Sequence, residues 1–357
     1  MTQSPAMPRP AVDADAAPDN QQLRRSRWLV LALLVLALLL CGIGLGVGSQ
    51  GLESVRTMLQ DAVARQIVWD IRLPRTLGAL LAGALLGLAG CVAQGLFRNP
   101  LADPYLLGSA SGASLGVALA MMLSGSSSLV LPWLVHLGMT GVAFIGSVLA
   151  VLLTLTLARG VQGGLRLLLA GVIVGVVLGA CKDVILLTHQ DILQAMQSYE
   201  LGSTGFIGWT ACVIMALVLL LCLLAAWSLS RVLDGLALGE ATARSLGLPL
   251  PAMQAALIGV LSLATAAAVA QTGLLAFVGL AAPHLVRSIV RVRHNRLVLL
   301  SALMGGVLLC AADLLARGLV APQELPVGVL TALLGGGYLL WLMHRQRSRS
   351  PLGQGEG

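Results

Sequence analysis

The charged side chains inside long apolar stretches are the first candidates for chemistry. Lys182 and Asp183 lie late in one such stretch, and Asp313 lies late in another. Ionisable groups are costly inside a membrane and are found there mainly on substrate or ion paths. As adjacent helical residues, Lys182 and Asp183 point in different directions, so we expect no simple ion pair. Two interpretations stay open for them: snorkelling near the membrane surface, or lining of a substrate cavity.

Nucleotide-binding and catalytic motifs are missing from the sequence. The phosphate loop G-x-x-x-x-G-K-[ST] needs a lysine followed by a hydroxyl residue, and the only lysine, Lys182, precedes Asp183. The run Gly108–Gly112 (GSASG) prompts the hypothesis of an intramembrane protease, but it lacks the G-x-S-G spacing. We therefore expect no catalytic site and no cofactor in this chain, so that any ATP and Mg²⁺ would be bound by a separate ATPase subunit.

Metal-ligand patterns are equally weak. No C-x-x-C spacing occurs, so the cysteines are expected to be small buried apolar residues, without disulfides or zinc. His136, His189 and His284 lie singly in separate segments and are expected to be packed or interfacial rather than haem ligands. The cysteines all fall in apolar runs: Cys41, Cys91, Cys181, Cys212, Cys222 and Cys310.

Composition places the chain in a membrane. Hydrophobic residues make up 57% and charged residues 10% of the sequence, whereas soluble domains average about 45–50% and about 25%. The 42 glycines and 4% aromatic residues suit helices that pack closely through small side chains. We predict an all-α, polytopic transmembrane bundle, whose basic charge reflects membrane orientation rather than nucleic-acid binding.

Ten apolar stretches are long enough to span a bilayer, which takes about 17–25 residues. We predict a disordered cytoplasmic tail over 1–22, a ten-helix transmembrane domain over 23–345 and a cytoplasmic tail over 346–357. The boundaries of the short stretch 274–290, which contains Pro283 and His284, are the least well defined by the sequence. The predicted spans are 28–47, 76–96, 105–124, 131–157, 167–188, 209–229, 252–271, 274–290, 297–316 and 327–343.

The arginines test this topology, because basic residues accumulate on the cytoplasmic side of membrane proteins. With both termini inside, 16 arginines fall in inner segments and five in outer ones. This asymmetry supports ten helices with cytoplasmic N- and C-termini. The five outer arginines are Arg56, Arg65, Arg72, Arg75 and Arg317.

Glycines recur every four residues on three predicted helices. They lie at 83 and 87, at 108, 112 and 116, and at 171, 175 and 179. Small residues at this spacing let helix backbones approach closely. Close packing is the simpler interpretation, and lining of a substrate path is the alternative.

The longest inner loop, about 231–251, contains a predicted short helix. Glu240 and Arg244 are spaced as a helical ion pair, and Gly247 and Pro249 are stop signals. A small helix at the inner surface is typical of a docking element for a partner, or of an interfacial turn without one.

Three sequence blocks resemble the permease subunits of binding-protein-dependent ABC importers, the FecCD family, over about 24–345. The first block is Arg72–Thr76 with Gln94–Pro104 and Leu107–Ala113. The second is the Gly239–Pro249 loop, and the third is Gly279–Arg287 followed by Glu324–Gly328.

The resemblance implies a permease homodimer that works with two ATPase subunits and a periplasmic substrate-binding protein. Arg72, Arg75 and Arg317 match positions that dock acidic side chains of the binding protein, where guanidinium groups bind carboxylates in a defined register. Asn99 and Leu101 match a cytoplasmic gate. The matching ATPase-coupling positions are Gly239, Glu240, Ala243, Arg244, Leu246, Gly247, Leu248 and Pro249.

The resemblance leaves some features open. A second gate of the family falls at Gln162–Leu165, where this sequence lacks the hydroxyl residues that relatives carry. An iron–siderophore, haem or cobalamin would fit the family, and we favour an iron chelate on family frequency. The alternative function is a secondary transporter driven by an ion gradient.

Overall fold

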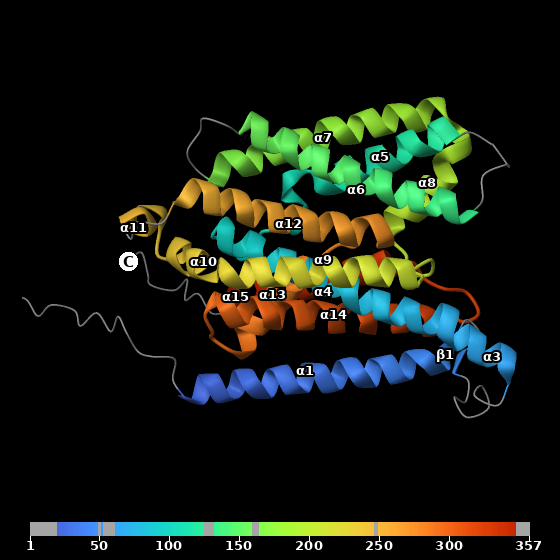
Figure 1. The fold of residues 1–357 in the computed structure, drawn as a ribbon, viewed down its shortest axis with the longest axis horizontal. Helices are drawn as coiled ribbons and strands as arrows, with labels where there is room; N and C mark the ends of the chain where they lie inside the picture. The colour runs from blue at the N-terminus through green and yellow to red at the C-terminus, as the bar shows by residue number, and fades with distance from the viewer. Residues whose placement is uncertain are drawn as a thin grey trace, which may run out of the picture.

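The computed structural model describes residues 20–48, 51–52, 61–124, 132–158, 164–245 and 249–347. The described elements are almost all helical; two two-residue strands, β1 (Val47–Gly48) and β2 (Gly51–Leu52), pair antiparallel after the first helix. The long helices run roughly parallel or antiparallel to one another along the bundle (Figure 1).

All ten predicted apolar stretches form helices. Seven described helices are long and apolar enough to cross a membrane by themselves, and the segments Ser109–Leu123 and Val327–Leu342 are shorter apolar helices. The ten helices are α1 (Asn20–Gly46), α4 (Leu73–Leu96), α5 (Ser109–Ser124), α6 (Pro132–Leu157), α7 (Gly164–Thr188), α9 (Trp209–Ser228), α12 (Leu250–Thr272), α13 (Val278–Ile289), α14 (His294–Gly318) and α15 (Val327–Arg347).

Several boundaries differ from the prediction. Helix α1 begins at Asn20, so three residues assigned to the tail are helical, and the tail over 1–19 lies outside the described residues. The predicted 76–96 helix continues back through η1 (Val68–Arg72) and α3 (Ala62–Ile67), giving an apolar helix of 35 residues. At 1.5 Å per residue it is about 52 Å long, which exceeds the bilayer's hydrocarbon core of about 30 Å.

Helix α13 is the largest departure from a regular span. It has only 12 residues, and the preceding 273–277 segment is not helical. Gly273 and Phe277 have positive φ angles of 69° and 67°, which turn the chain before the helix starts. Irregular backbone at membrane depth is tolerated where protein or a cavity surrounds it. The predicted 274–290 helix is therefore wrong in its first turn.

Glycine contacts hold the centre of the bundle. A Cβ at Gly83 would lie 2.3 Å from the Gly305 carbonyl oxygen, and one at Gly87 would lie 2.2 Å from that of Ser301. Both contacts join α4 to α14, whose backbones therefore touch. A Cβ at Gly90 would lie 1.7 Å from the Gly279 oxygen, so α4 also meets α13 without an intervening side chain. The close-packing interpretation of these glycines is confirmed.

A second layer consists of α5, α6 and α7, which lies across α12 from the α4–α14 pair (Figure 1). Gly112 of α5 packs against the backbone of Gly146 in α6, and Gly171 of α7 packs against the Leu106 carbonyl. A Cβ at Gly179 would meet no atom of the described residues within 4 Å. The glycine spacing on α7 therefore reports packing at one end of the helix only.

The two ends of the bundle differ. One end gathers α10 (Ser230–Ala237), α11 (Glu240–Ser245), the start of α1 and the end of α15, and we call it the arginine-rich end (Figure 1). The opposite end, called the α8 end, carries α3 and α8 (Leu193–Leu201). Exposed tryptophans mark both ends, as in interfacial belts: Trp28, Trp227 and Trp341 at the first, and Trp69 at the second.

Candidate functional site

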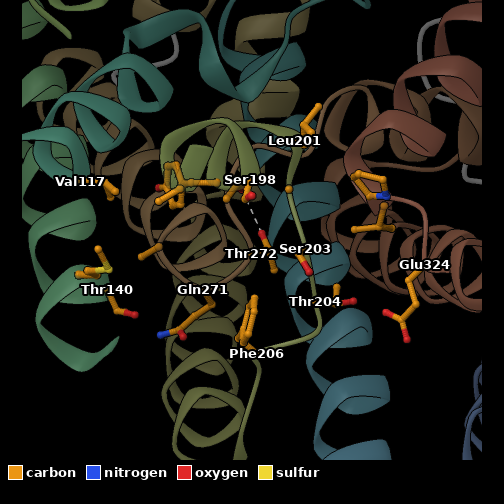
Figure 2. Close-up of a pocket in the computed structure, with 18 of the residues that line it drawn as sticks. Val117, Thr140, Ser198, Leu201, Ser203, Thr204, Phe206, Gln271, Thr272 and Glu324 are labelled. Atoms are coloured by element: carbon orange, nitrogen blue, oxygen red, sulfur yellow. Dashed lines mark hydrogen bonds between the residues drawn. The ribbon is translucent and has the colours of Figure 1, made fainter. Parts of the chain in front are cut away.

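A cavity of about 450 Å³ opens at the α8 end. Residues from α5, α6, α8, the end of α12 and the chain before α15 line it, together with the 202–206 segment that follows α8. Figure 2 shows Val117 and Thr140 on one side of the cavity and Thr204 and Glu324 on the other. Elements far apart in the sequence thus share one chamber.

The lining combines polar and apolar groups. Hydroxyl and amide side chains come from Thr140, Ser198 and Gln271, and apolar surface comes from Met121 and Met139. Such a mixed wall can offer a solute both apolar contacts and hydrogen bonds.

An ionic cluster borders the cavity. The guanidinium of Arg75 in α4 lies 2.8 Å from a Glu324 carboxylate oxygen and 3.4 Å from Asp313 Oδ1. Both Arg75 and Glu324 also line the cavity. The cluster therefore joins α4, α14 and the chain before α15 at the cavity mouth.

Asp313 is the buried centre of this cluster. Its side chain is fully buried and also accepts hydrogen bonds from Arg317 and from the Thr204 hydroxyl. Arg317 donates a second bond to Thr76 Oγ1 at 3.3 Å. A buried charge needs this kind of pairing, because an unpaired charge in a low-dielectric interior is very costly.

The three predicted docking arginines occupy different environments. Arg317 is only 2% exposed and bound to Asp313, so little of its side chain is accessible at the surface. The Arg75 side chain is 13% exposed and already paired with carboxylates. Arg72 lies in η1 and donates a hydrogen bond to the Leu45 carbonyl at 3.2 Å. The docking roles of Arg72, Arg75 and Arg317 stay predictions.

Lys182 and Asp183 form an ion pair after all, contrary to the sequence-based expectation. Lys182 Nζ lies 3.2 Å from Asp183 Oδ1 and also binds Glu200 of α8. Neither Lys182 nor Asp183 is among the residues that line the 450 Å³ cavity. Because α8 forms one wall of that cavity, Lys182 instead fastens this wall to α7.

Sequence reasoning missed Glu200, Glu324 and Thr204, although Glu324 stands in the third family block.

The predicted short helix exists at the arginine-rich end as α11. Glu240 Oε1 and Arg244 Nη2 are 2.9 Å apart, as their spacing predicted. Gly239 has a φ of 110°, which lets the chain turn sharply from α10 into α11, and Ala243 is fully buried. Pro249 directly precedes α12. The other predicted coupling positions, Leu246, Gly247 and Leu248, lie outside the described residues.

The predicted gate residues lie in the loop between α4 and η2 (Pro104–Leu107). Asn99 Oδ1 accepts a hydrogen bond from the Leu101 amide at 2.9 Å, and the Leu101 side chain is 52% exposed. Arg98 has a φ of 49° at this turn. Both residues are accessible at the arginine-rich end, and their role in gating stays a prediction. Of the second gate, Gln162 and Gly163 lie outside the described residues.

The cysteines and histidines occupy several environments. Four cysteines are buried, but Cys181 is exposed and Cys41 half-buried. His284 is half-buried and its Nδ1 lies 2.8 Å from the Tyr338 hydroxyl, which joins α13 to α15. The His136 side chain lies outside the part of the chain that the structure describes.

Asp234 caps α14 at the arginine-rich end. Its carboxylate accepts a hydrogen bond from the His294 amide at 3.1 Å and lies 2.7 Å from His294 Nδ1. Burial acts to raise the pKa of Asp234, but the hydrogen bonds and charge of His294 outweigh it, so the pKa lies below the ordinary 3.8. The Asp234 carboxylate therefore stabilises the fold at pH values above its pKa in the unfolded chain. This contribution is lost as the pH falls through the lower pKa that the group has in the folded protein.

In the Asp234→Asn variant, the stability of the fold should therefore no longer show the part of its decrease at low pH that arises below about pH 4. We also expect faster hydrogen exchange at residues 294–297 at neutral pH, because the neutral Asn side chain lacks the negative charge that holds His294. Hydrogen exchange across a pH series measures both effects, with Asp191→Asn, an exposed carboxylate at the other end, as the control. Equal exchange in both variants would contradict the capping role.

Comparison with known proteins agrees with this architecture. A model of the FecCD transport family matches residues 29–345. The hemin transport system permease protein HmuU of Yersinia pestis is 40% identical over 330 residues, which cover 90% of this chain and 97% of the relative. The vitamin B12 import system permease protein BtuC of Klebsiella pneumoniae is 38% identical over 335 residues, covering 92% and 97%.

A solved structure described as a metal-chelate type ABC transporter in an inward-facing conformation shares the fold. Its TM-score is 0.79 at 28% identity, and the match covers 89% of this chain and 99% of that one. The fold therefore defines a helical membrane permease. The chain belongs to the FecCD transport family, since the family match spans nearly the whole bundle.

Proposed function

We propose that this chain is the membrane-spanning permease of a bacterial ABC importer, located in the inner membrane with both termini in the cytoplasm. Two copies would assemble with two separate ATPase subunits and receive cargo from a periplasmic substrate-binding protein. The family match over residues 29–345 is the observation that carries this proposal. The separate α11 helix supports it as a contact for the ATPase.

The cargo is proposed to be a bulky metal chelate. The relatives are named for hemin and for vitamin B12, which are both metal chelates. An iron–siderophore, expected from the sequence, belongs to the same chemical class. The mixed lining of the 450 Å³ cavity fits this class, since it presents apolar and hydrogen-bonding surface together.

In this proposal the α8 end receives the cargo and the arginine-rich end couples to ATP. ATP-driven closure of the partner ATPases would move α11 and, through Asp234 and His294, the start of α14. The same helix carries Asp313 at its other end, beside the cavity. A rigid α14 can therefore move both ends of the path together, as in rigid-body switching.

Reconstituted transport tests the proposal and names the cargo. Proteoliposomes with the permease, its ATPase and its binding protein should import one of hemin, cobalamin or a ferric siderophore only when ATP is supplied. A proton or sodium ionophore should leave this import unchanged. Import that persists without the ATPase and stops with an ionophore would instead establish the secondary transporter.

Charge reversal at the α8 end tests docking. The double variant Arg72→Glu with Arg75→Glu should abolish the stimulation of ATP hydrolysis by the loaded binding protein, because it repels acidic docking groups. Arg65→Glu, an exposed arginine of α3, is the matched control. The thermal unfolding midpoint of each variant separates failed docking from unfolding, and full stimulation in a folded double variant would refute docking here.

A further inference from the structure

Two basic segments from distant parts of the chain meet at the arginine-rich end. One is the first part of α1, and the other connects α13 to α14. Each contributes three arginines within a short stretch. They are Arg24, Arg25 and Arg27 in the first segment, and Arg291, Arg293 and Arg296 in the second.

Direct hydrogen bonds hold the two segments together. The Arg296 guanidinium donates to Ser26 Oγ at 2.9 Å, and the Arg291 amide donates to Gln22 Oε1 at 3.4 Å. Ser26 is only 3% exposed, although it lies among exposed arginines. These contacts define a seam between α1 and α14, which we call the basic seam.

The charges of the basic seam are only partly offset within the protein that the structure describes. The negative charge of Asp234 interacts with Arg293, although the two side chains form no ion pair. No carboxylate among residues 20–48, 51–52, 61–124, 132–158, 164–245 and 249–347 forms an ion pair with its six arginines, and five of the six are exposed. Neither segment contains an acidic residue. Like charges at this density repel one another, so an anion seated between them would stabilise the contact.

The seam lies where phospholipid headgroups lie. Trp28, which is 60% exposed, follows Arg27 directly, and apolar residues continue along α1. Tryptophan at a helix end marks the headgroup level of a membrane. Helix α1 packs on α14 and α4 but buries only Ser26, Leu33, Gly44 and Gly46. Its exposed leucines, such as Leu31 and Leu38, offer a surface for acyl chains beneath the arginines.

We propose that the basic seam binds the phosphate headgroup of an anionic membrane phospholipid. Guanidinium groups bind phosphate oxygens through paired hydrogen bonds, and basic pockets between transmembrane helices are known to hold anionic lipids. The bound lipid bridges the first turns of α1 to the α13–α14 connection and fastens a helix that the protein core holds only weakly. This site is independent of the cargo, the ATPase and the binding protein.

Native mass spectrometry of the purified permease tests this site. In nanodiscs of phosphatidylcholine with a minority of phosphatidylglycerol, the wild type should retain phosphatidylglycerol preferentially on release. The variant Arg291→Gln with Arg293→Gln should bind it on the order of 10- to 30-fold more weakly, from the loss of two arginines near the membrane surface. Arg166→Gln with Arg231→Gln removes the same charge from exposed positions elsewhere at this end and should retain the lipid.

Three outcomes would overturn the site. Equal retention by the two double variants would show that net charge alone attracts the lipid, and no preference in the wild type would show no site at all. The wild-type result stands even where a variant fails to fold.

The chain's own tail is the alternative occupant, because Asp13, Asp15 and Asp19 precede α1 in the sequence. A variant lacking residues 2–18 is therefore the third arm of the experiment. Lipid retention that appears only after this deletion would make the chain's own tail the occupant.

Discussion

Replacing Asp313 with alanine is expected to lower the free energy of unfolding by about 3–5 kcal/mol. The side chain is fully buried and binds Arg75, Arg317 and Thr204. Its removal leaves the Arg317 guanidinium, 2% exposed, without its carboxylate. The thermal unfolding midpoint of the detergent-purified permease measures the loss.

Asp183→Ala is the matched control, since it removes a carboxylate whose side chain is 67% exposed. Exposed ion pairs contribute about 0–1 kcal/mol, so this change should be nearly neutral. A second variant, Asp313→Leu with Arg317→Met, removes both buried charges and should regain much of the stability. Similar midpoints for Asp313→Ala and Asp183→Ala would show that the cluster is not structurally important.

The Asp313→Ala variant should also have a functional consequence at the cavity. Asp313 holds Thr204 and Arg75, which both line the chamber. Without that carboxylate, the 202–206 segment and the chain before α15 lose their shared anchor. We expect transport to fall more than stability alone explains, which import assays at a temperature well below the unfolding midpoint would reveal.

The second large effect is expected at Gly90, where the added methyl group of alanine has no room. Its Cβ would lie 1.7 Å from the Gly279 carbonyl oxygen, which is backbone and cannot rotate away. Overpacking of this kind costs about 1–3 kcal/mol and occasionally more. Because the contact fixes α13 against α4, Gly90→Ala should displace the short helix and sharply reduce the folded yield.

Gly42→Ala controls for helix propensity, because a Cβ at Gly42 meets no atom of the described chain within 4 Å. Alanine is favoured over glycine within a helix by about 1 kcal/mol, so this variant should be as stable as the wild type or more so. Size-exclusion profiles and unfolding midpoints compare the two. A monodisperse Gly90→Ala permease with an unchanged midpoint would contradict the packing described for α4 and α13.

The ten helices could be predicted because each depends on its own composition. A run of apolar residues of bilayer length forms a helix whatever its neighbours are, and α11 follows from the local spacing of Glu240 and Arg244. The short α13 was harder to predict, since the non-helical segment before it is held by distant residues, for example by the hydrogen bond from the Tyr105 hydroxyl to the Leu275 carbonyl. The family, likewise, could be inferred from blocks of adjacent residues.

The environment of single charges was decided by tertiary structure alone. Arg317 and Arg75 look alike in the sequence, yet one is buried and the other borders the cavity. Lys182 finds Glu200, and Arg296 finds Ser26, across 18 and 270 residues of sequence. Local composition determined which segments enter the membrane, because hydrophobic transfer is a sum over neighbouring residues. Pairing across the bundle depends on helix packing and on the cost of an unpaired charge, and only the folded chain determines those.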